Sequence, residues 1–526
     1  MPLHFVFQGG IMIMASKKKF HKKLTAAAVL LLLANLLLFL TIWLLQKYDQ
    51  IYFEQLLYQL KAPSGDVEGS LLSSAYIRVG LFGFAATFIE IMAWLVLSGK
   101  VRKKLPENKK YRRYCATDLC RFFRKRALPL SMAAFLFGLC VFVQRFDVIA
   151  YVDIHSDESD FIESHYTDPA DAQLTFPDEK RNLIYIFLES MENTFADPSA
   201  GEPITANYIP ELTMLADEHT SFSHTDGIGG AFSHTGTTWT AASMVSQTCG
   251  VHVKVPVGSD SFGGEDVFMP GVVSIGEILE DQGYRQTLLL GSDAEFHGRE
   301  SYFVQHGNYH IIDSHSLKAE GRLPEDYEEW WGYEDEKLFS FAKEELLKLA
   351  EEDGPFNFTM LTADTHFPDG YVCRLCGDTY EEQYPNVLAC SSRQIMAFIE
   401  WIQAQDFYEN TTIILSGDHL TMDPEFLKDL NEDYVRTTYN CIINAPIEPV
   451  QEKQRQFAAF DMFPTTLAAL GVEIEGDRLG LGTNLYSDQP TLTEQYGFEM
   501  TDLELQKKSA FYNDMLLQMN TEETSE

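Results

Sequence analysis

The feature that most restricts how this chain can fold is an almost unbroken run of 22 apolar residues near its start, Leu24–Leu45. Such a run is long enough to cross a hydrocarbon core of about 30 Å as a helix. Basic residues precede it, as in a secretory signal peptide, but it is longer than a signal peptide's apolar region and leads to no small-residue cleavage site. We therefore predict an uncleaved membrane-spanning helix over about residues 24–45.

Two further apolar runs predict two more spanning helices, over about residues 75–97 and 128–143. Glu90 lies inside the second span, and we expect it to face the helix bundle and to pair locally. Between these spans, residues 100–126 contain twelve Lys and Arg, and basic loops of this kind are retained in the cytoplasm. The sequence therefore predicts a multi-pass protein of the cell membrane whose body, after about Val152, is extracytoplasmic.

The charge is divided sharply along the chain. Residues 1–152 carry 21 Lys and Arg against 8 Asp and Glu, about +13, whereas the remainder carries 19 against 69, about −50; together they give the net charge of −37. A body this acidic repels the phosphate backbone of nucleic acids, which excludes nucleic acid as a partner. The apolar content of the whole chain, 45%, argues against disorder.

The region after the spans divides into three predicted parts: a polar linker at 153–180, a folded domain at 181–490 and an acidic tail at 491–526. Apolar runs of strand length occur in the folded domain at 183–188, 286–290, 356–361, 411–415 and 440–443. Helical periodicity occurs at 209–219, 274–282, 334–351, 388–403 and 460–470, the last ended by Gly471. Buried runs that alternate with helices predict an α/β domain with a central, mostly parallel sheet flanked by helices.

Polar residues directly follow four of the predicted strands. They are Glu189, the segment 291–299, the segment 363–366 and the segment 416–419. In an open α/β sheet, ligands bind beyond the carboxyl ends of the strands. We therefore expect carboxylates, imidazoles and a guanidinium to meet at one edge of the sheet.

Glu189, Asp418 and His419 offer two carboxylates and an imidazole, a set that suits Mn²⁺, Mg²⁺ or Zn²⁺. We expect Gly417 to allow the sharp turn that would bring them around one ion. Thr240, in a Gly- and Thr-rich segment, would complete the set, and a hydroxyl beside a divalent ion becomes a nucleophile near neutral pH. The structural alternatives are an Asp418 that only caps a helix, a Glu189 that is a loop carboxylate, and a Thr-rich segment that is a plain loop.

Arg299 and His366 are the candidates for contacts with a phosphoryl group. The planar fork of an arginine suits phosphate oxygens, and a histidine can donate a proton to a leaving oxygen. His297 is a further candidate because it is close to Arg299 in the sequence. Each of these histidines could equally be structural, since the outer body contains twelve.

Three cysteines of the body, Cys373, Cys376 and Cys390, are close together in the sequence. Cys373-Arg-Leu-Cys376 resembles half of a zinc site, but no second pair of matching ligands follows. In an exported domain we favour a disulfide from Cys390 to Cys373 or to Cys376 over free thiols.

Several motifs together resemble one family. They are Asn182-Leu-Ile-Tyr-Ile-Phe-Leu-Glu189-Ser, Trp239-Thr240, Asp364-Thr-His366-Phe-Pro-Asp-Gly370, Ser416-Gly-Asp418-His419, and the helical segment 460–471. This combination is similar to the phosphoglycerol transferases of the alkaline-phosphatase/sulfatase superfamily, the group that contains lipoteichoic acid synthase. The segment Phe53–Tyr58 is also similar to the branch of this family that modifies periplasmic glucans.

The resemblance implies a sulfatase-like fold and an enzyme that moves glycerol phosphate from phosphatidylglycerol to a glycan or teichoic-acid-type acceptor. It also implies one Mn²⁺-like ion held by Glu189, Thr240, Asp418 and His419, with Thr240 as the nucleophile. Arg299 and His366 fall where the family contacts the phosphoglycerol group.

The chain also departs from the family pattern. Three spans are predicted where lipoteichoic acid synthase commonly has five, and the positions of that enzyme's substrate-contacting histidine and tryptophan are Leu290 and His297 here. No Cys/Ser-x-Pro-x-Arg motif of true sulfatases occurs around Thr240, which argues against hydrolysis of sulfate esters. The alternatives are a phosphoethanolamine transferase, another ester hydrolase of the superfamily, and an inactive envelope protein that kept the fold.

Overall fold

The computed structural model describes residues 4–48, 53–61, 73–97, 118–254, 267–327, 329–423 and 425–518. The chain forms two compact units. The first comprises Met1–Ile51 and Val67–Ala150, and the second comprises Tyr52–Asp66 and Tyr151–Glu526. The segment Tyr52–Asp66 thus belongs to the second unit, although the first unit continues on both sides of it.

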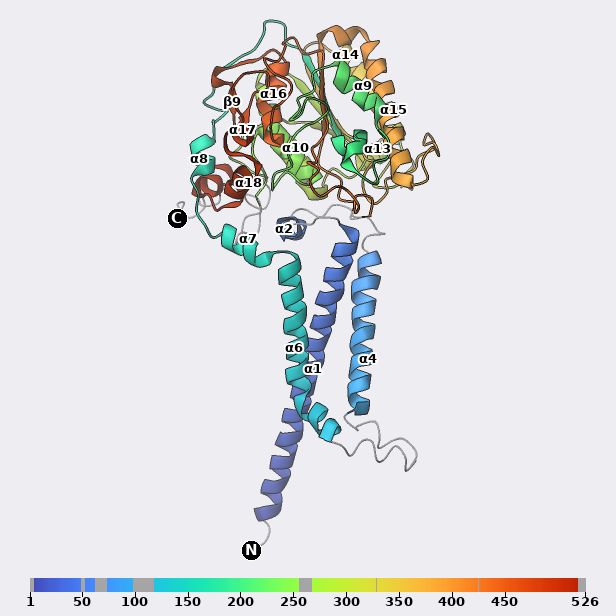
Figure 1. Ribbon diagram of the computed structural model, residues 1–526, viewed down its shortest axis with the longest axis vertical. Helices are drawn as coiled ribbons and strands as arrows, with labels where there is room; N and C mark the ends of the chain where they lie inside the picture. Colours follow the sequence, from blue (N-terminus) through green and yellow to red (C-terminus); the bar gives the residue numbers. More distant parts are fainter. Residues whose placement is uncertain are drawn as a thin grey trace. The chain divides into compact units, whose positions relative to one another are not determined.

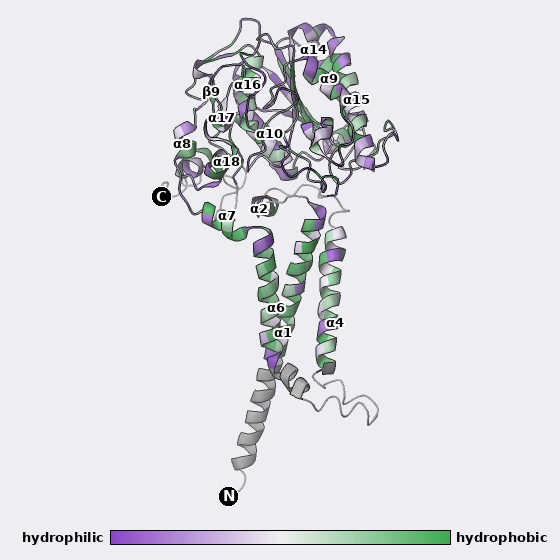
Figure 2. Ribbon diagram, in the orientation of Figure 1, coloured by the Kyte–Doolittle hydropathy of each residue, from purple (hydrophilic) through white to green (hydrophobic). Residues whose placement is uncertain are grey.

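The first unit is built from long helices. They are α1 (His4–Lys47), the π-helical η1 (Tyr76–Leu81), which continues as α4 (Phe82–Leu97), and α6 (Asp118–Arg145). Among the described residues, three stretches are long and apolar enough to cross a membrane, Lys23–Lys47, Ser73–Leu95 and Arg126–Arg145, and Figure 2 shows their apolar character. They agree with the predicted spans to within two residues at each end.

Small residues allow α1 to approach both neighbouring helices closely. A Cβ placed on Gly138 of α6 would lie 3.3 Å from the carbonyl oxygen of Ala34, and one on Gly83 would lie 2.8 Å from Leu36 Cδ2. Without a hydrophobic driving force between helices in lipid, close packing of this kind supplies much of their association.

Glu90 pairs inside this bundle, as predicted. Asn35 Nδ2 donates hydrogen bonds to Glu90 Oε2 over 2.8 Å and to Thr87 Oγ1 over 3.0 Å. The polar groups of α1 and α4 therefore satisfy one another, which favours association of the two helices in an apolar solvent.

The second unit is organised around a six-stranded sheet with the strand order β4-β3-β5-β2-β6-β7. The strands are β2 (Asn182–Leu188), β3 (Arg285–Leu290), β4 (His310–Ile312), β5 (Phe356–Leu361), β6 (Thr411–Gly417) and β7 (Asn440–Ile443). All neighbouring pairs are parallel except β6 with β7. The predicted mostly parallel sheet is confirmed, with an antiparallel strand at one edge.

The central strand β2 shows why these runs lack polar alternation. Successive side chains of a strand point to opposite faces of the sheet. Leu183, Tyr185 and Phe187 belong to one buried cluster, and the intervening Ile184, Ile186 and Leu188 belong to another. Because both faces are covered, every position from 183 to 188 must be apolar.

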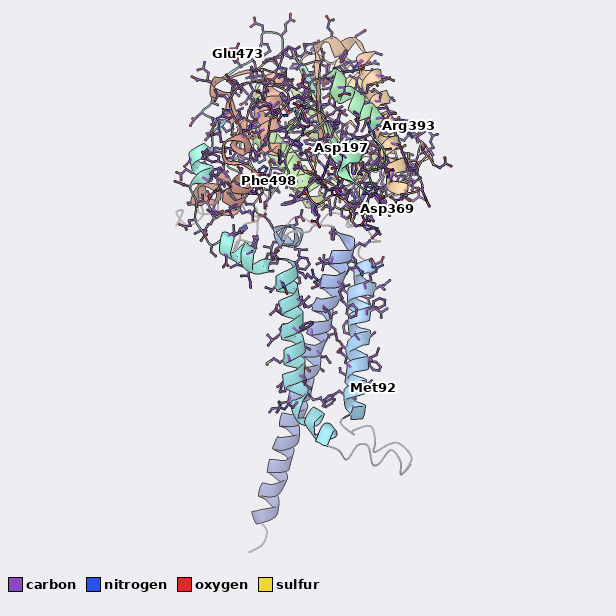
Figure 3. All side chains as sticks on the ribbon, viewed as in Figure 1. Met92, Asp197, Asp369, Arg393, Glu473 and Phe498 are labelled. Atoms are coloured by element: carbon purple, nitrogen blue, oxygen red, sulfur yellow. The ribbon has the colours of Figure 1, made fainter. Side chains whose placement is uncertain are left out.

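Helices cover both faces, as Figure 1 shows. On one side lie α9 (Pro210–Glu218), α14 (Asp335–Glu351) and α15 (Gln383–Gln403); on the other lie α10 (Thr240–Cys249), α11 (Ile275–Asp281) and α16 (Met462–Ala469). The shorter helices are α12 (Arg299–Gln305), α13 (Ser314–Ala319), α17 (Leu492–Tyr496) and α18 (Phe498–Gln506). Side chains fill the space between the layers (Figure 3).

Sequence periodicity explains the position of several helices. In α15, Tyr384, Leu388, Ser391 and Ile395 recur at helical spacing and are all buried. Helix α11 begins with a capping box, in which Ser274 Oγ accepts from the backbone N–H of Glu277 and the Glu277 side chain accepts from that of Ser274. Gly471 has a φ of +84°, the left-handed conformation expected of a residue that ends a helix.

Two predicted segments differ from the structure. The predicted linker, 153–180, contains α8 (Phe161–His165), with Phe161 and Ile162 buried, and β1 (Leu174–Thr175), which pairs with β8 (Glu473–Ile474). The predicted tail from 491 contains α17 and α18, and its Leu505, Tyr512 and Leu516 are buried. Both segments were predicted to be a linker and a tail because most of their residues are charged or polar. A few apolar side chains nevertheless pack each segment against the domain.

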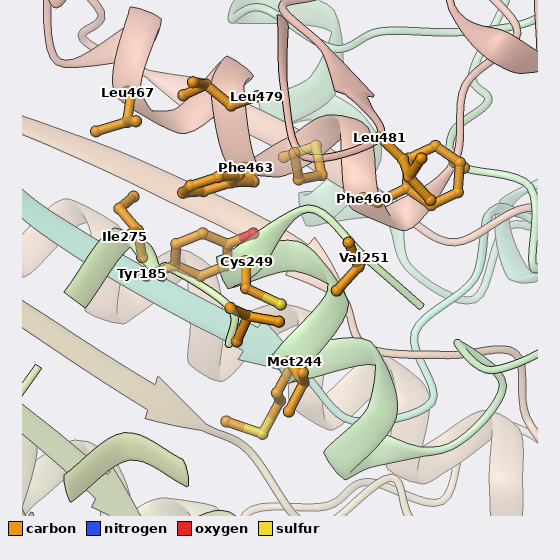
Figure 4. Close-up of a cluster of buried hydrophobic side chains, with 14 of the residues drawn as sticks. Tyr185, Met244, Cys249, Val251, Ile275, Phe460, Phe463, Leu467, Leu479 and Leu481 are labelled. Atoms are coloured by element: carbon orange, nitrogen blue, oxygen red, sulfur yellow. The ribbon is translucent and has the colours of Figure 1, made fainter. Parts of the chain in front are cut away.

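Helix α10 packs on the sheet next to β2. Figure 4 shows Tyr185 of β2 beside Cys249 of α10 and Phe463 of α16. The Tyr185 hydroxyl donates to Gln247 Oε1 over 2.7 Å, and Gln247 Nε2 donates to the carbonyl oxygen of Gly417 over 3.3 Å. These buried hydrogen bonds fix α10 against the strand ends, which positions its first residue, Thr240.

Candidate metal and nucleophile site

Pairing between β2 and β6 brings two candidate metal ligands together. Leu188 pairs with Gly417 in parallel register, so Glu189 and Asp418 leave the sheet side by side. Ser190 then turns the chain with a φ of +52°, a conformation uncommon for residues other than glycine. Its backbone N–H donates to Asp418 Oδ1 over 2.7 Å, and its hydroxyl donates to Glu189 Oε1 over 2.7 Å.

Gly417 is needed for a reason other than the predicted one. It lies in the extended strand β6, and the sharp turn falls at Ser190 instead. A Cβ on Gly417 would lie 2.0 Å from the carbonyl oxygen of Met191, far inside contact distance. Glycine is therefore required because the backbone after β2 passes directly over this position.

Thr240 is the first residue of α10 and faces two of the candidate ligands. Its Oγ1 lies 3.4 Å from Glu189 Oε2 and 3.3 Å from His419 Nε2. The neighbouring threonines make other contacts: Thr237 Oγ1 donates to the carbonyl oxygen of His234 over 2.8 Å, and Thr238 Oγ1 accepts from Gln55 Nε2 over 2.7 Å. The positive end of the α10 dipole also favours negative charge at Thr240.

The tautomer of His419 leaves its Nε2 available as a ligand. Nδ1 lies 2.8 Å from the carbonyl oxygen of Leu420, and because a carbonyl only accepts, Nδ1 carries the proton. Nε2 then faces Glu189 Oε1 at 3.6 Å and Asp418 Oδ2 at 3.4 Å. A histidine held in this way, with one nitrogen donating to the backbone, is the usual arrangement of a metal ligand.

The two carboxylates and the imidazole are buried together at an electrostatic cost. Burial and, to a smaller extent, the Glu189 carboxylate raise the pKa of Asp418 to about 7. Burial alone would lower the pKa of His419, but the charges of Asp418 and Glu189 raise it overall. Asp418 Oδ2 is buried and has no hydrogen-bond partner among the described residues.

This donor set fits a divalent cation. Ligand atoms of Glu189, Asp418 and His419 all lie within 4.8 Å of one another, and all three residues are buried. A cation would satisfy the unpartnered Asp418 oxygen and offset the repulsion between the carboxylates. The structural alternative for Asp418, a helix cap, is wrong, because no helix begins there in the described chain. Asp418 Oδ1 instead accepts from the backbone N–H groups of Ser190 and His419.

The loop after β5 is tied to the same site. Thr365 Oγ1 donates to the carbonyl oxygen of Glu189 over 2.6 Å, and the Glu189 N–H donates to Thr362 Oγ1 over 3.0 Å. The next residue, His366, has Nδ1 2.7 Å from the carbonyl oxygen of Phe367. As for His419, this contact places the proton on Nδ1 and directs Nε2 away from the backbone.

Arg299, His297 and His366 lie close enough to influence one another. Burial and, to a smaller extent, the charges of Arg299 and His366 lower the pKa of His297 to about 3. Trp331 lies between the two loops, with its ring centre 4.6 Å from that of His366 and 5.9 Å from that of Phe296. His297 is therefore neutral at physiological pH.

Part of the Arg299 donor set is used inside its own loop. Nη2 donates to the carbonyl oxygen of Asp293 over 2.6 Å and to Ser292 Oγ over 3.1 Å, and Nε donates to the carbonyl oxygen of Phe296 over 3.1 Å. Arg299 thus shapes the segment 291–299, which limits how its fork can meet a phosphate in this conformation.

Sequence reasoning missed three contributors to the site. Ser190 hydrogen-bonds to Glu189 and Asp418, Trp331 packs against His366, and Gln55 of α2 (Phe53–Lys61) holds the loop before Thr240 through Thr238. Gln55 belongs to the segment 53–58 already noted for its resemblance, which was the available signal. Ser190 ends the motif that contains Glu189, which was a signal for it, whereas Trp331 belongs to none of the motifs.

Comparison with known proteins identifies a family that this chain matches. The sulfatase family model matches residues 181–472. Phosphoglycerol transferase I from Escherichia coli strain 55989 is 32% identical over 334 residues, which cover 62% of this chain and 41% of that protein. The chain thus spans about two fifths of the length of the curated relatives it matches.

Two solved structures are also similar. A protein of the alkaline phosphatase superfamily from Vibrio parahaemolyticus has a TM-score of 0.46 and 20% identity, covering 64% of this chain and 79% of its own. The lipoteichoic acid synthase LtaP from Listeria monocytogenes has a TM-score of 0.46 and 17% identity, covering 62% of this chain and 80% of its own.

Proposed function

This chain belongs to the sulfatase family, and from that premise we propose that it is a membrane-anchored phosphoglycerol transferase that uses Thr240 as its nucleophile. The observation that carries the proposal is the position of Thr240 Oγ1, 3.4 Å from Glu189 Oε2 and 3.3 Å from His419 Nε2 at the start of α10. A hydroxyl placed among two metal-ligand candidates and a helix N-terminus is set up for attack on an electrophilic phosphorus. The 32% identity to phosphoglycerol transferase I supports the same reaction class.

Glu189, Asp418, His419 and Thr240 are the residues proposed to hold one divalent ion. Mn²⁺ is favoured over Zn²⁺ because oxygens dominate the set, and over Mg²⁺ because the set includes an imidazole. When bound, the ion would lower the pKa of the Thr240 hydroxyl and offset charge on phosphoryl oxygens. Ser190 would keep Glu189 and Asp418 oriented through its hydrogen bonds.

The proposed reaction has two steps. Thr240 Oγ1, after its proton has passed to solvent, forms a bond to the phosphorus of phosphatidylglycerol, the bond from phosphorus to the diacylglycerol oxygen breaks, and the doubly protonated His366 donates its Nε2 proton to that oxygen. A hydroxyl of a glycan or polyglycerol-phosphate acceptor then attacks the same phosphorus and releases Thr240, with His366 accepting the proton of the attacking hydroxyl. The helix dipole of α10 stabilises the charge that develops at Thr240 in both steps.

The membrane anchor fits a lipid donor, which remains in the bilayer. We propose that the second unit is extracytoplasmic, on the basis of the twelve Lys and Arg in residues 100–126 between the second and third spans. The donor would then be reached from the outer leaflet, where envelope glycans are also found.

Mass spectrometry of the full chain after incubation with phosphatidylglycerol tests the proposal. We expect an adduct of about 154 Da, a glycerophosphoryl group, on a peptide that contains Thr240. Thr240→Ala should abolish the adduct, whereas Thr238→Ala, in the same loop, should still form it, although more slowly because the hydrogen bond from Gln55 is lost. An adduct on another residue, or one formed from phosphatidylethanolamine instead, would contradict the assignment of nucleophile or donor, respectively.

A further inference from the structure

Three cysteine sulfurs gather in the second unit outside the site described above. Cys373 and Cys376 lie in the connection between β5 and α15, and Cys390 lies on α15 itself. The Sγ of Cys373 is 3.7 Å from that of Cys376 and 3.7 Å from that of Cys390. All three sulfurs lie within 4.8 Å of one another, and Cys373 and Cys390 are buried.

These distances do not match the predicted disulfide from Cys390 to Cys373 or Cys376. A disulfide bond is about 2.05 Å long, and all three cysteines are free thiols in the structure. Four ligands placed tetrahedrally around zinc with Zn–S distances of about 2.3 Å are separated by about 3.8 Å along each edge of the tetrahedron. The two separations of 3.7 Å are thus what a thiolate metal site requires.

One side chain donates toward two of the three sulfurs. Gln394 Nε2 lies 3.5 Å from Cys390 Sγ and 3.8 Å from Cys373 Sγ. N–H groups that donate to ligand sulfurs are a regular part of metal–thiolate sites.

We propose that Cys373, Cys376 and Cys390 bind one Zn²⁺ ion, separate from the ion of Glu189, Asp418 and His419. Three sulfurs select a thiophilic ion, whereas the oxygen-rich set around Thr240 selects a harder one. The spacing C-x₂-C followed by a cysteine on a helix supplies three ligands, and solvent completes the fourth position. Sequence reasoning found only half a zinc site because the third ligand stands alone on α15.

Zinc at this position would stabilise one conformation of the long connection between β5 and α15. Residues 362–382 join β5 to α15 without a helix or strand among them, and this connection carries His366. A connection of this length needs its own constraints to hold one conformation. The ion would cross-link its middle, at Cys373 and Cys376, to the first turns of α15, and so keep His366 in place.

X-ray absorption spectroscopy at the zinc edge tests the proposal on the full chain, purified in detergent and loaded with Zn²⁺ alone. Zn²⁺ could also occupy the site of Glu189, Asp418 and His419, so the sulfur count is taken from the Asp418→Asn variant, in which that site is weakened. For this variant we expect about three sulfur neighbours near 2.3 Å. Cys390→Ser should lose sulfur scattering, and Cys140→Ser, which alters a cysteine of the first unit, should match the wild type.

Cys376→Ser provides a second variant if Cys390→Ser does not fold, because Cys376 is only half-buried. For this variant we expect loss of sulfur scattering and faster hydrogen exchange in residues 362–382. A wild-type zinc shell of nitrogen and oxygen only would overturn the proposal. So would peptide mapping that finds a disulfide between any two of the three cysteines in protein prepared without reductant.

Discussion

Substitution of Gly417 offers a sharp test of how the strand ends build the site. A Cβ at this position would lie 2.0 Å from the carbonyl oxygen of Met191, a backbone atom that cannot rotate away. Contacts of a Cβ closer than 3.0 Å are essentially never seen, so Gly417→Ala must separate the two backbone segments by about 1 Å. The displaced residues would be Asp418 and His419 on one side and Glu189 on the other.

The expected changes in reaction rate and in stability follow from this displacement. A misplacement of about 1 Å at a catalytic group costs on the order of 10²-fold in rate, and overpacking of a filled interior costs about 1–3 kcal/mol of stability. We therefore expect Gly417→Ala to fold with a lower melting temperature and to form the Thr240 adduct roughly 100-fold more slowly.

The assay is the rate of adduct formation with phosphatidylglycerol, measured together with thermal unfolding. Gly227→Ala is the matched control, because the nearest atom to a Cβ at that position is Thr225 Oγ1 at 3.9 Å. If Gly417→Ala forms the adduct at the wild-type rate while remaining folded, the strand ends do not set the geometry of the nucleophile, and our account of the site is wrong.

Three further predictions concern the ion, the pH dependence and the interior. Treatment with a chelator should stop formation of the Thr240 adduct, and added Mn²⁺ should restore it, as followed by mass spectrometry. The folded-state pKa of Asp418 is raised to about 7, so this carboxyl favours folding at low pH and loses that contribution as the pH rises through 7. The melting temperature of the chelator-treated wild type should therefore fall more between about pH 5 and pH 8 than that of Asp418→Asn. Equal falls in the two proteins would contradict the assignment. Tyr185→Phe removes the buried donor to Gln247 Oε1 and should cost about 1–3 kcal/mol in a denaturation experiment without altering the zinc content.

Much of the fold could be predicted because its central strands are covered on both faces. The run from Leu183 to Leu188 has no polar residue, and a parallel sheet is the arrangement that buries such a strand. Strand β4 was missed because His310–Ile312 is only three residues long and its first residue is exposed. The acidic C-terminal part was misjudged because its few buried side chains, such as Tyr512, are separated by charged residues.

The site residues that directly follow a strand could be predicted from the sequence. The position of Glu189 beside Asp418 follows from the register of β2 and β6, which topology alone suggests. The position of Thr240 depends on α10, whose Ala- and Ser-rich start gave no periodic signal. The turn at Ser190 and the close passage of Met191 over Gly417 depend on the path of the backbone, which no residue pattern specifies.

The hydrogen bond from Gln55 to Thr238 has a consequence for any shortened form of this protein. Helix α2 is part of the second unit, yet in the chain it is separated from the rest of that unit by the second and third apolar helices. Proteolysis near residue 150 would release the rest of the second unit without α2. The released fragment would keep every proposed metal ligand but would lack the hydrogen bond from Gln55 to the loop that carries Thr240. We therefore expect a lower turnover rate for the fragment than for the intact enzyme.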